Sequence, residues 1–111
     1  MSEIGHTSSD LGSGPVVIHV DASFEPLVPK FMTNRKKEIT TMAEAVAQED
    51  FETVRKMAHG AKGAGGSYGF DEVTAIAARL EQAAKTADAE SIRNDLTALA
   101  SYLERVTVVY D

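Results

Sequence analysis

Residues 59–70 read His59-Gly60-Ala61-Lys62-Gly63-Ala64-Gly65-Gly66-Ser67-Tyr68-Gly69-Phe70. Five of these twelve residues are glycine, yet the sequence on both sides keeps the spacing of a helix. On a helix, residues three and four apart share a face. One face is then apolar and consists of Val54, Met57, Ala61, Ala64 and Tyr68. The opposite face carries Arg55, His59, Lys62, Gly63 and Gly66.

The glycines need a reason because each one destabilises a helix by about 0.5–1 kcal/mol relative to alanine. Four of them cost about 2–4 kcal/mol, a large share of the roughly 5–15 kcal/mol that stabilises a small domain. We interpret Gly63 and Gly66 as positions that leave the His59 ring accessible to another surface, and Gly60 and Gly65 as positions for close helix packing. The sequence therefore predicts an exposed, nucleophilic imidazole at His59.

The pattern His-x-x-Lys-Gly, followed three residues later by glycine in a helix ending Ser-Tyr-Gly-Phe, resembles the histidine phosphotransfer (HPt) domain of bacterial phosphorelays. The resemblance covers about residues 20–106. It implies that His59 accepts and donates a phosphoryl group at Nε2 and that Lys62 supports its charge. It also implies that Gly63 and Gly66 give clearance to a response-regulator receiver domain, which supplies Mg²⁺ and an aspartate, while a histidine kinase supplies ATP.

Composition fits one soluble globular domain, with 111 residues, 43% hydrophobic and 25% charged. The absence of cysteine excludes disulfides and thiolate sites. Neither a secretory signal nor a membrane-spanning apolar run is present, so we expect a cytoplasmic protein that binds no membrane. A net charge of −6 disfavours nucleic acid as a partner. Arg55, Lys56 and Lys62 nevertheless form a basic spot around His59, suited to an acidic partner or a phosphoryl group.

Residues 1–21 are predicted to form a flexible arm that includes a short strand-like segment, Pro15–Val20. Val108-Val109-Tyr110 is the comparable segment at the other end, and the two either pair or dock separately on the domain. We expect no function for His6, and a structural or exposed position for His19.

Residues 22–111 are predicted to form an all-α, antiparallel, up-down-up-down four-helix bundle, because four amphipathic segments are joined by short loops. The first helix begins after Ser23 as N-cap and runs to about Gln48, with Pro29 marking a bend or a separate first turn. Arg35 is expected to form a surface ion pair. The predicted inward residues of this helix are Leu27, Phe31, Ile39, Met42 and Val46.

The other helices are predicted from their caps. Asp50, Asp71 and Asp88 are candidate N-caps, and Gly69 ends the helix that carries His59. Tyr68 and Phe70 are expected to close that helix end by packing on the bundle. The predicted inward residues of the last two helices are Val73, Ile76, Ala77, Leu80 and Ala84, then Ile92, Leu96, Leu99, Leu103 and Val106.

Phosphoryl transfer needs mainly positioning and charge stabilisation, so an exposed imidazole suffices for a carrier. Repulsion from Lys62 and Arg55 is expected to favour the neutral, nucleophilic ring of His59. The sequence contains no nucleotide-binding glycine motif and no acidic cluster for Mg²⁺, so we expect no cofactor and no metal. The leading hypothesis is a monomeric phosphocarrier, not an enzyme. The alternatives are a helical docking module that is not phosphorylated and an enzyme with its own catalytic histidine.

Overall fold

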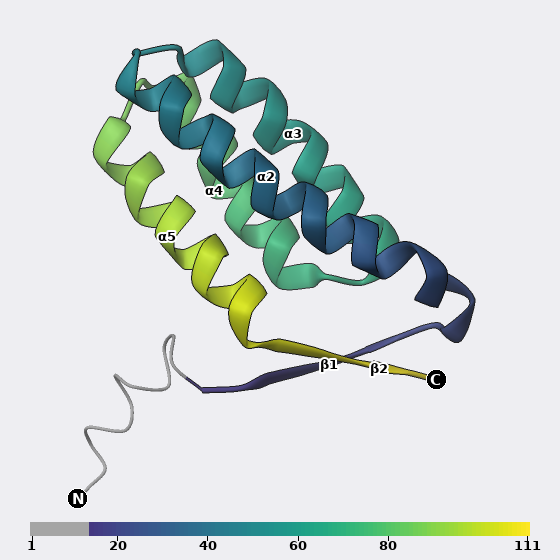
Figure 1. Cartoon of the computed structure of the whole chain (residues 1–111). Helices are drawn as coiled ribbons and strands as arrows, with labels where there is room; N and C mark the ends of the chain where they lie inside the picture. The colour runs from purple at the N-terminus through teal and green to yellow at the C-terminus, as the bar shows by residue number, and fades with distance from the viewer. Residues whose placement is uncertain (1–13) are drawn as a thin grey trace, which may run out of the picture.

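A computed structural model describes residues 14–111 of the chain. Four antiparallel helices form a bundle, and a two-stranded sheet made from both ends of this segment lies across one end of it (Figure 1). The predicted all-α bundle is therefore confirmed. In chain order the elements are β1 (Val16–Val20), the 3₁₀ helix η1 (Ala22–Leu27), α2 (Val28–Ala47), α3 (Phe51–Tyr68), α4 (Asp71–Lys85), α5 (Ala89–Arg105) and β2 (Val106–Tyr110).

The turns between the helices follow local chemistry. The Asp50 and Asp88 side chains accept hydrogen bonds from the backbone N–H groups of Thr53 and Ser91, which confirms both N-caps. Gly69 ends α3 with φ at 85°, a left-handed conformation that glycine adopts without strain. The prediction for Asp71 was wrong, because Phe70 occupies the N-cap position and Asp71 is already the first helical residue.

The beginning of the first helix also differs from the prediction. Asp21, not Ser23, is the capping residue, and its carboxylate accepts from the Ser23 backbone N–H at 2.8 Å. The six residues that follow form the separate helix η1, and Pro29 lies in the first turn of α2, where proline is tolerated. Leu27, at the junction, is 47% exposed and does not belong to the buried stripe.

The core forms where the apolar faces of the four helices meet. α2 contacts α3 and α5, and α4 contacts the same two helices from the opposite side. Ile39 is only half-buried, and Val106 is half-buried because it opens β2 instead of continuing α5. On α3 the buried face is turned slightly from the predicted one, so Met57, Ala64 and Tyr68 are half-buried at its margin. The buried residues of α3 are Val54, Ala58, Ala61 and Gly65. The stripe predicted for α4 is buried throughout.

An aromatic cluster closes one end of the bundle, as predicted for Tyr68 and Phe70. The Phe31 ring stacks on the Phe70 ring, with 4.5 Å between centroids, and meets the Tyr68 ring edge-on. Arg35 lies over Phe31 and forms an ion pair with Glu38, Nε to Oε1 2.8 Å. The ion pair was predicted but its surface position was not, because Arg35 is only 8% exposed.

The strand-like segments at the two ends pair with each other. β1 and β2 run parallel, with Val16 opposite Val106 and Val20 opposite Tyr110. The strands alternate in burial, and their inner side chains pack on the helical core. Of the two alternatives that the sequence left open, pairing is the one observed; the parallel direction and the register were not predicted, because the two strands are separated by the whole bundle. Within residues 14–111, no helix is long and apolar enough to cross a membrane.

Candidate functional site

His59 lies on the outer face of α3, and its side chain is 67% exposed. Gly63 and Gly66 are exposed on the same face, one and two turns further on. Arg55, one turn before the histidine, and Lys62 are half-buried, and Lys56 is exposed. The structure therefore brings the predicted residues together around an accessible ring.

The glycines of α3 serve two different purposes. A Cβ atom added at Gly60 or Gly63 would meet nothing within 4 Å, and one at Gly66 would only touch Thr74 Oγ1 at 3.8 Å. A Cβ at Gly65 would lie 2.7 Å from Thr74 Oγ1, and 3.1 Å from both the Thr74 backbone nitrogen and the carbonyl oxygen of Phe70, the N-cap of α4. Close packing is thus confirmed for Gly65. For Gly60 the prediction was wrong, because Gly60 is exposed and lies against no other helix.

Glu81 of α4 is the residue that sequence reasoning missed. Its Oε2 lies 3.0 Å from His59 Nδ1, and its Oε1 accepts a hydrogen bond from Lys62 Nζ at 2.7 Å. The Glu81 side chain is 10% exposed, compared with 37% for Lys62. One signal was available in the sequence: Glu81 lies four residues after Ala77 and three before Ala84, so a carboxylate interrupts the apolar face of α4.

The electrostatics of this cluster differ from the expectation based on cations alone. The hydrogen bond from Lys62, followed by that from His59, lowers the pKa of Glu81, although burial opposes this effect. The carboxylate is therefore ionised at neutral pH and can only accept hydrogen bonds. The nitrogen that faces it, His59 Nδ1, must then donate. In the neutral ring, the lone pair then lies on Nε2, which faces away from the carboxylate.

Arg55 and Lys56 do not contact the ring. Both are held by Glu52, which binds Arg55 through a pair of hydrogen bonds and has its Oε2 3.9 Å from Lys56 Nζ. The Arg55 hydrogen bond is the largest effect lowering the pKa of Glu52. Like-charge repulsion on His59 is therefore weaker than predicted, because a carboxylate accompanies each neighbouring cation.

The other histidines lie elsewhere. His19 Nδ1 lies 2.8 Å from Asp111 Oδ2 at the edge of the terminal sheet, and both side chains are largely exposed. His6 falls outside the described residues. Exposure thus does not distinguish His59 from His19. Two other features do: the glycines on the helix face beside His59, and the hydrogen bond from Lys62 to the carboxylate that contacts the His59 ring. Residues 14–111 contain no group of three metal-ligating His, Cys, Asp or Glu side chains.

Comparison with known families decides the classification. The family described as Hpt domain matches residues 27–107, which span α2 to α5 and begin and end close to the bundle. The chain belongs to the Hpt domain family. No curated protein and no solved structure matches it. As an Hpt domain it is a histidine phosphotransfer module of phosphorelays, a carrier and not a catalyst, and acts with kinases and receiver domains. β1 and all of η1 except Leu27 lie outside the matched range.

Proposed function

We propose that this Hpt domain carries a phosphoryl group on Nε2 of His59, shuttling it between a histidine kinase or a receiver aspartate and a response-regulator receiver domain. The observation that carries the proposal is that the two nitrogens of the His59 imidazole have different surroundings. Nδ1 lies 3.0 Å from the buried Glu81 carboxylate, so in the neutral ring the lone pair is on Nε2, and the His59 side chain is 67% exposed. A nucleophile in this state needs no further activation within the chain.

Lys62 is the proposed charge support. Its ammonium group is bonded to the same carboxylate that holds the ring, so it lies on the histidine side of α3. A phosphoryl group on Nε2 would bring two negative charges to this position, and a nearby cation stabilises them. Because the Lys62 side chain is 37% exposed, it has room to turn toward such a group.

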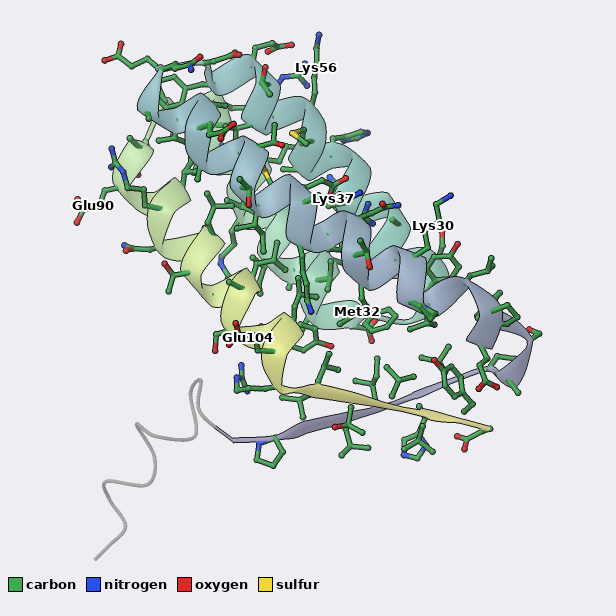
Figure 2. All side chains as sticks on the ribbon, viewed as in Figure 1. Lys30, Met32, Lys37, Lys56, Glu90 and Glu104 are labelled. Carbon is green, nitrogen blue, oxygen red and sulfur yellow. The ribbon has the colours of Figure 1, made fainter. Side chains whose placement is uncertain are left out.

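The docking surface we propose consists of Arg55, Lys56, Gly63 and Gly66. The glycines let a partner approach the ring closely, since a side chain at Gly63 would extend into open space. The three cations Arg55, Lys56 and Lys62 outnumber the two carboxylates that bind them, so this face suits an acidic partner. Lys56 on α3 and Lys30 and Lys37 on α2 project from neighbouring helices, whereas Glu90 and Glu104 lie on α5 (Figure 2).

Figure 2 thus places the labelled cations and anions on different sides of the bundle. A receiver active site, with its aspartate and Mg²⁺, would carry the opposite charge to the lysine side. We propose that the receiver supplies these groups, and that this Hpt domain supplies the positioned imidazole and the nearby ammonium group.

The test is transfer of labelled phosphate from a phosphorylated receiver domain, or from a histidine kinase and ATP, to the purified chain. We expect an acid-labile, alkali-stable adduct that His59→Gln abolishes and the matched control His19→Gln retains. Binding to the receiver without any label would refute the carrier function and support a docking module that is not phosphorylated.

A further inference from the structure

The Glu81 contact has a chemical consequence for the phosphorylated ring. We propose that Glu81 keeps a proton on Nδ1 of His59 throughout the transfer cycle, so that the phosphohistidine stays in a cationic form from which the phosphoryl group leaves readily. This inference rests on the proposed phosphorylation of His59. It makes Glu81 a positioning residue, because its carboxylate touches the ring nitrogen opposite to the reacting one.

The bonds balance without any additional proton transfer. The Nε2 lone pair forms the new N–P bond while the P–O bond to the partner's aspartate breaks, and that electron pair leaves with the carboxylate. The ring becomes a cation because Nδ1 still carries its proton. On onward transfer an aspartate oxygen of the next receiver forms a new P–O bond while the N–P bond breaks, and the N–P electron pair returns to Nε2. The leaving group is then the neutral ring with the proton still on Nδ1, the same tautomer as at the start.

Without Glu81, the phosphorylated ring would lose the Nδ1 proton more easily to water. The leaving group would then be an imidazolate-like anion, which departs far less readily than a neutral imidazole. An ionised carboxylate at 3.0 Å opposes this loss, because an opposite charge in contact favours the charged form of its partner. A neutral amide at the same position would accept the hydrogen bond but would not contribute the charge.

Two features hold the Glu81 carboxylate in its contact with His59. Lys62 Nζ donates to its second oxygen at 2.7 Å, which fixes the orientation of the carboxylate and lowers the pKa of Glu81. The side chain is 10% exposed, so water screens the contact weakly. Among the described residues, Lys62 and His59 are the titratable groups that affect the Glu81 pKa, and Glu81 in turn affects the pKa of Arg55. All of these lie on α3 and α4, and α2 contributes none of them.

The experiment measures the ring proton directly. The full chain, labelled with ¹⁵N in its histidines, is phosphorylated with phosphoramidate, which requires neither kinase nor receiver. The ¹⁵N chemical shifts of the phosphorylated ring are then followed between pH 6 and 9. This range is wide enough because an opposite charge in contact shifts a pKa by about one to three units. We expect Nδ1 to remain protonated in the wild type to a midpoint at least about one pH unit higher than in Glu81→Gln.

The matched control is Glu72→Gln, which removes the same charge from an exposed position on α4. It should titrate like the wild type, and circular dichroism should show that both variants keep their helices. The hydrolysis of the phosphohistidine should be slower in Glu81→Gln than in Glu72→Gln at pH 8. Equal midpoints in the two variants would overturn the proposal, and so would an unprotonated Nδ1 in the wild type at pH 7, whatever the folding of the variants.

The outcomes also separate this inference from the proposed function. Normal relay from a receiver together with an unprotonated Nδ1 would refute only the role of Glu81. A protonated Nδ1 in the chemically phosphorylated chain, with no transfer to or from receivers, would refute only the relay. A ring that accepts phosphate from neither phosphoramidate nor a receiver would refute both.

Discussion

Replacing Gly65 with alanine tests how closely α3 and α4 approach beside the site. The new Cβ would lie 2.7 Å from Thr74 Oγ1, 3.1 Å from the Thr74 backbone nitrogen and 3.1 Å from the Phe70 carbonyl oxygen. The hydroxyl cannot turn away without loss, because it donates to the Lys62 carbonyl oxygen at 3.0 Å. The two backbone atoms belong to the start of α4, so relieving the contact requires the helices to separate.

The expected magnitude follows from two opposing effects. Alanine has a better helix propensity than glycine and stabilises by about 0.5–1 kcal/mol. Overpacking of a filled interior destabilises by about 1–3 kcal/mol. Gly65→Ala should therefore lower the free energy of unfolding by about 1 kcal/mol, and Tm by about 4–8 °C for a domain of this size.

Gly63→Ala is the matched control, because a Cβ there meets nothing within 4 Å. It gains the same propensity without the contact, so it should raise the free energy of unfolding by about 0.5–1 kcal/mol. The difference between the two variants in urea unfolding isolates the contact, about 1–3 kcal/mol. If Gly65→Ala were as stable as Gly63→Ala, the close approach of α3 and α4 at this position would be refuted.

Three further predictions concern the site and the caps. Lys62→Ala should slow phosphoryl transfer at His59 without unfolding the domain, and a large loss of helicity by circular dichroism would contradict this. Gly63→Leu should weaken receiver binding, measured by calorimetry, while leaving the unfolding midpoint near that of Gly63→Ala; unchanged binding would show that the partner does not approach there. Hydrogen bonds from Ser91 and Thr53 lower the pKa values of Asp88 and Asp50. The stability that these two carboxylates contribute is therefore fully present above about pH 4 and is lost as the pH falls through their lowered pKa values. In Asp88→Asn the urea unfolding midpoint should therefore change less with pH between pH 5 and 2.5 than it does in the wild type.

Much of the architecture could be predicted because it depends on local chemistry. Asp50 and Asp88 cap helices through backbone groups three residues away, and Gly69 ends α3 through its own φ angle. These interactions need no distant partner. Where the local signal was ambiguous the prediction was wrong: Asp21 and Ser23 are both good caps, and the structure uses Asp21. Asp71 resembles a cap but lies one residue inside α4.

The site was predicted in part. The helical spacing that placed His59, Gly63 and Gly66 on one exposed face is a property of α3 alone, so it could be read from the sequence. Glu81 could not be paired with them in the same way, because it is 22 residues from His59 and reaches it only when α4 packs on α3. The same packing explains why Gly65 and Gly60 differ, although both are glycines in one helix.

Periodicity and capping act within a few residues, so the sequence was enough to predict the four helices, the caps at Asp50 and Asp88, the end of α3 at Gly69 and an exposed imidazole. The tertiary structure alone decided the tautomer of His59, through a buried carboxylate from the next helix, and the parallel pairing of Val16–Val20 with Val106–Tyr110. The physical reason is that a contact between distant residues depends on the angle and depth at which two elements pack. Neither quantity is encoded in the pattern of either element alone.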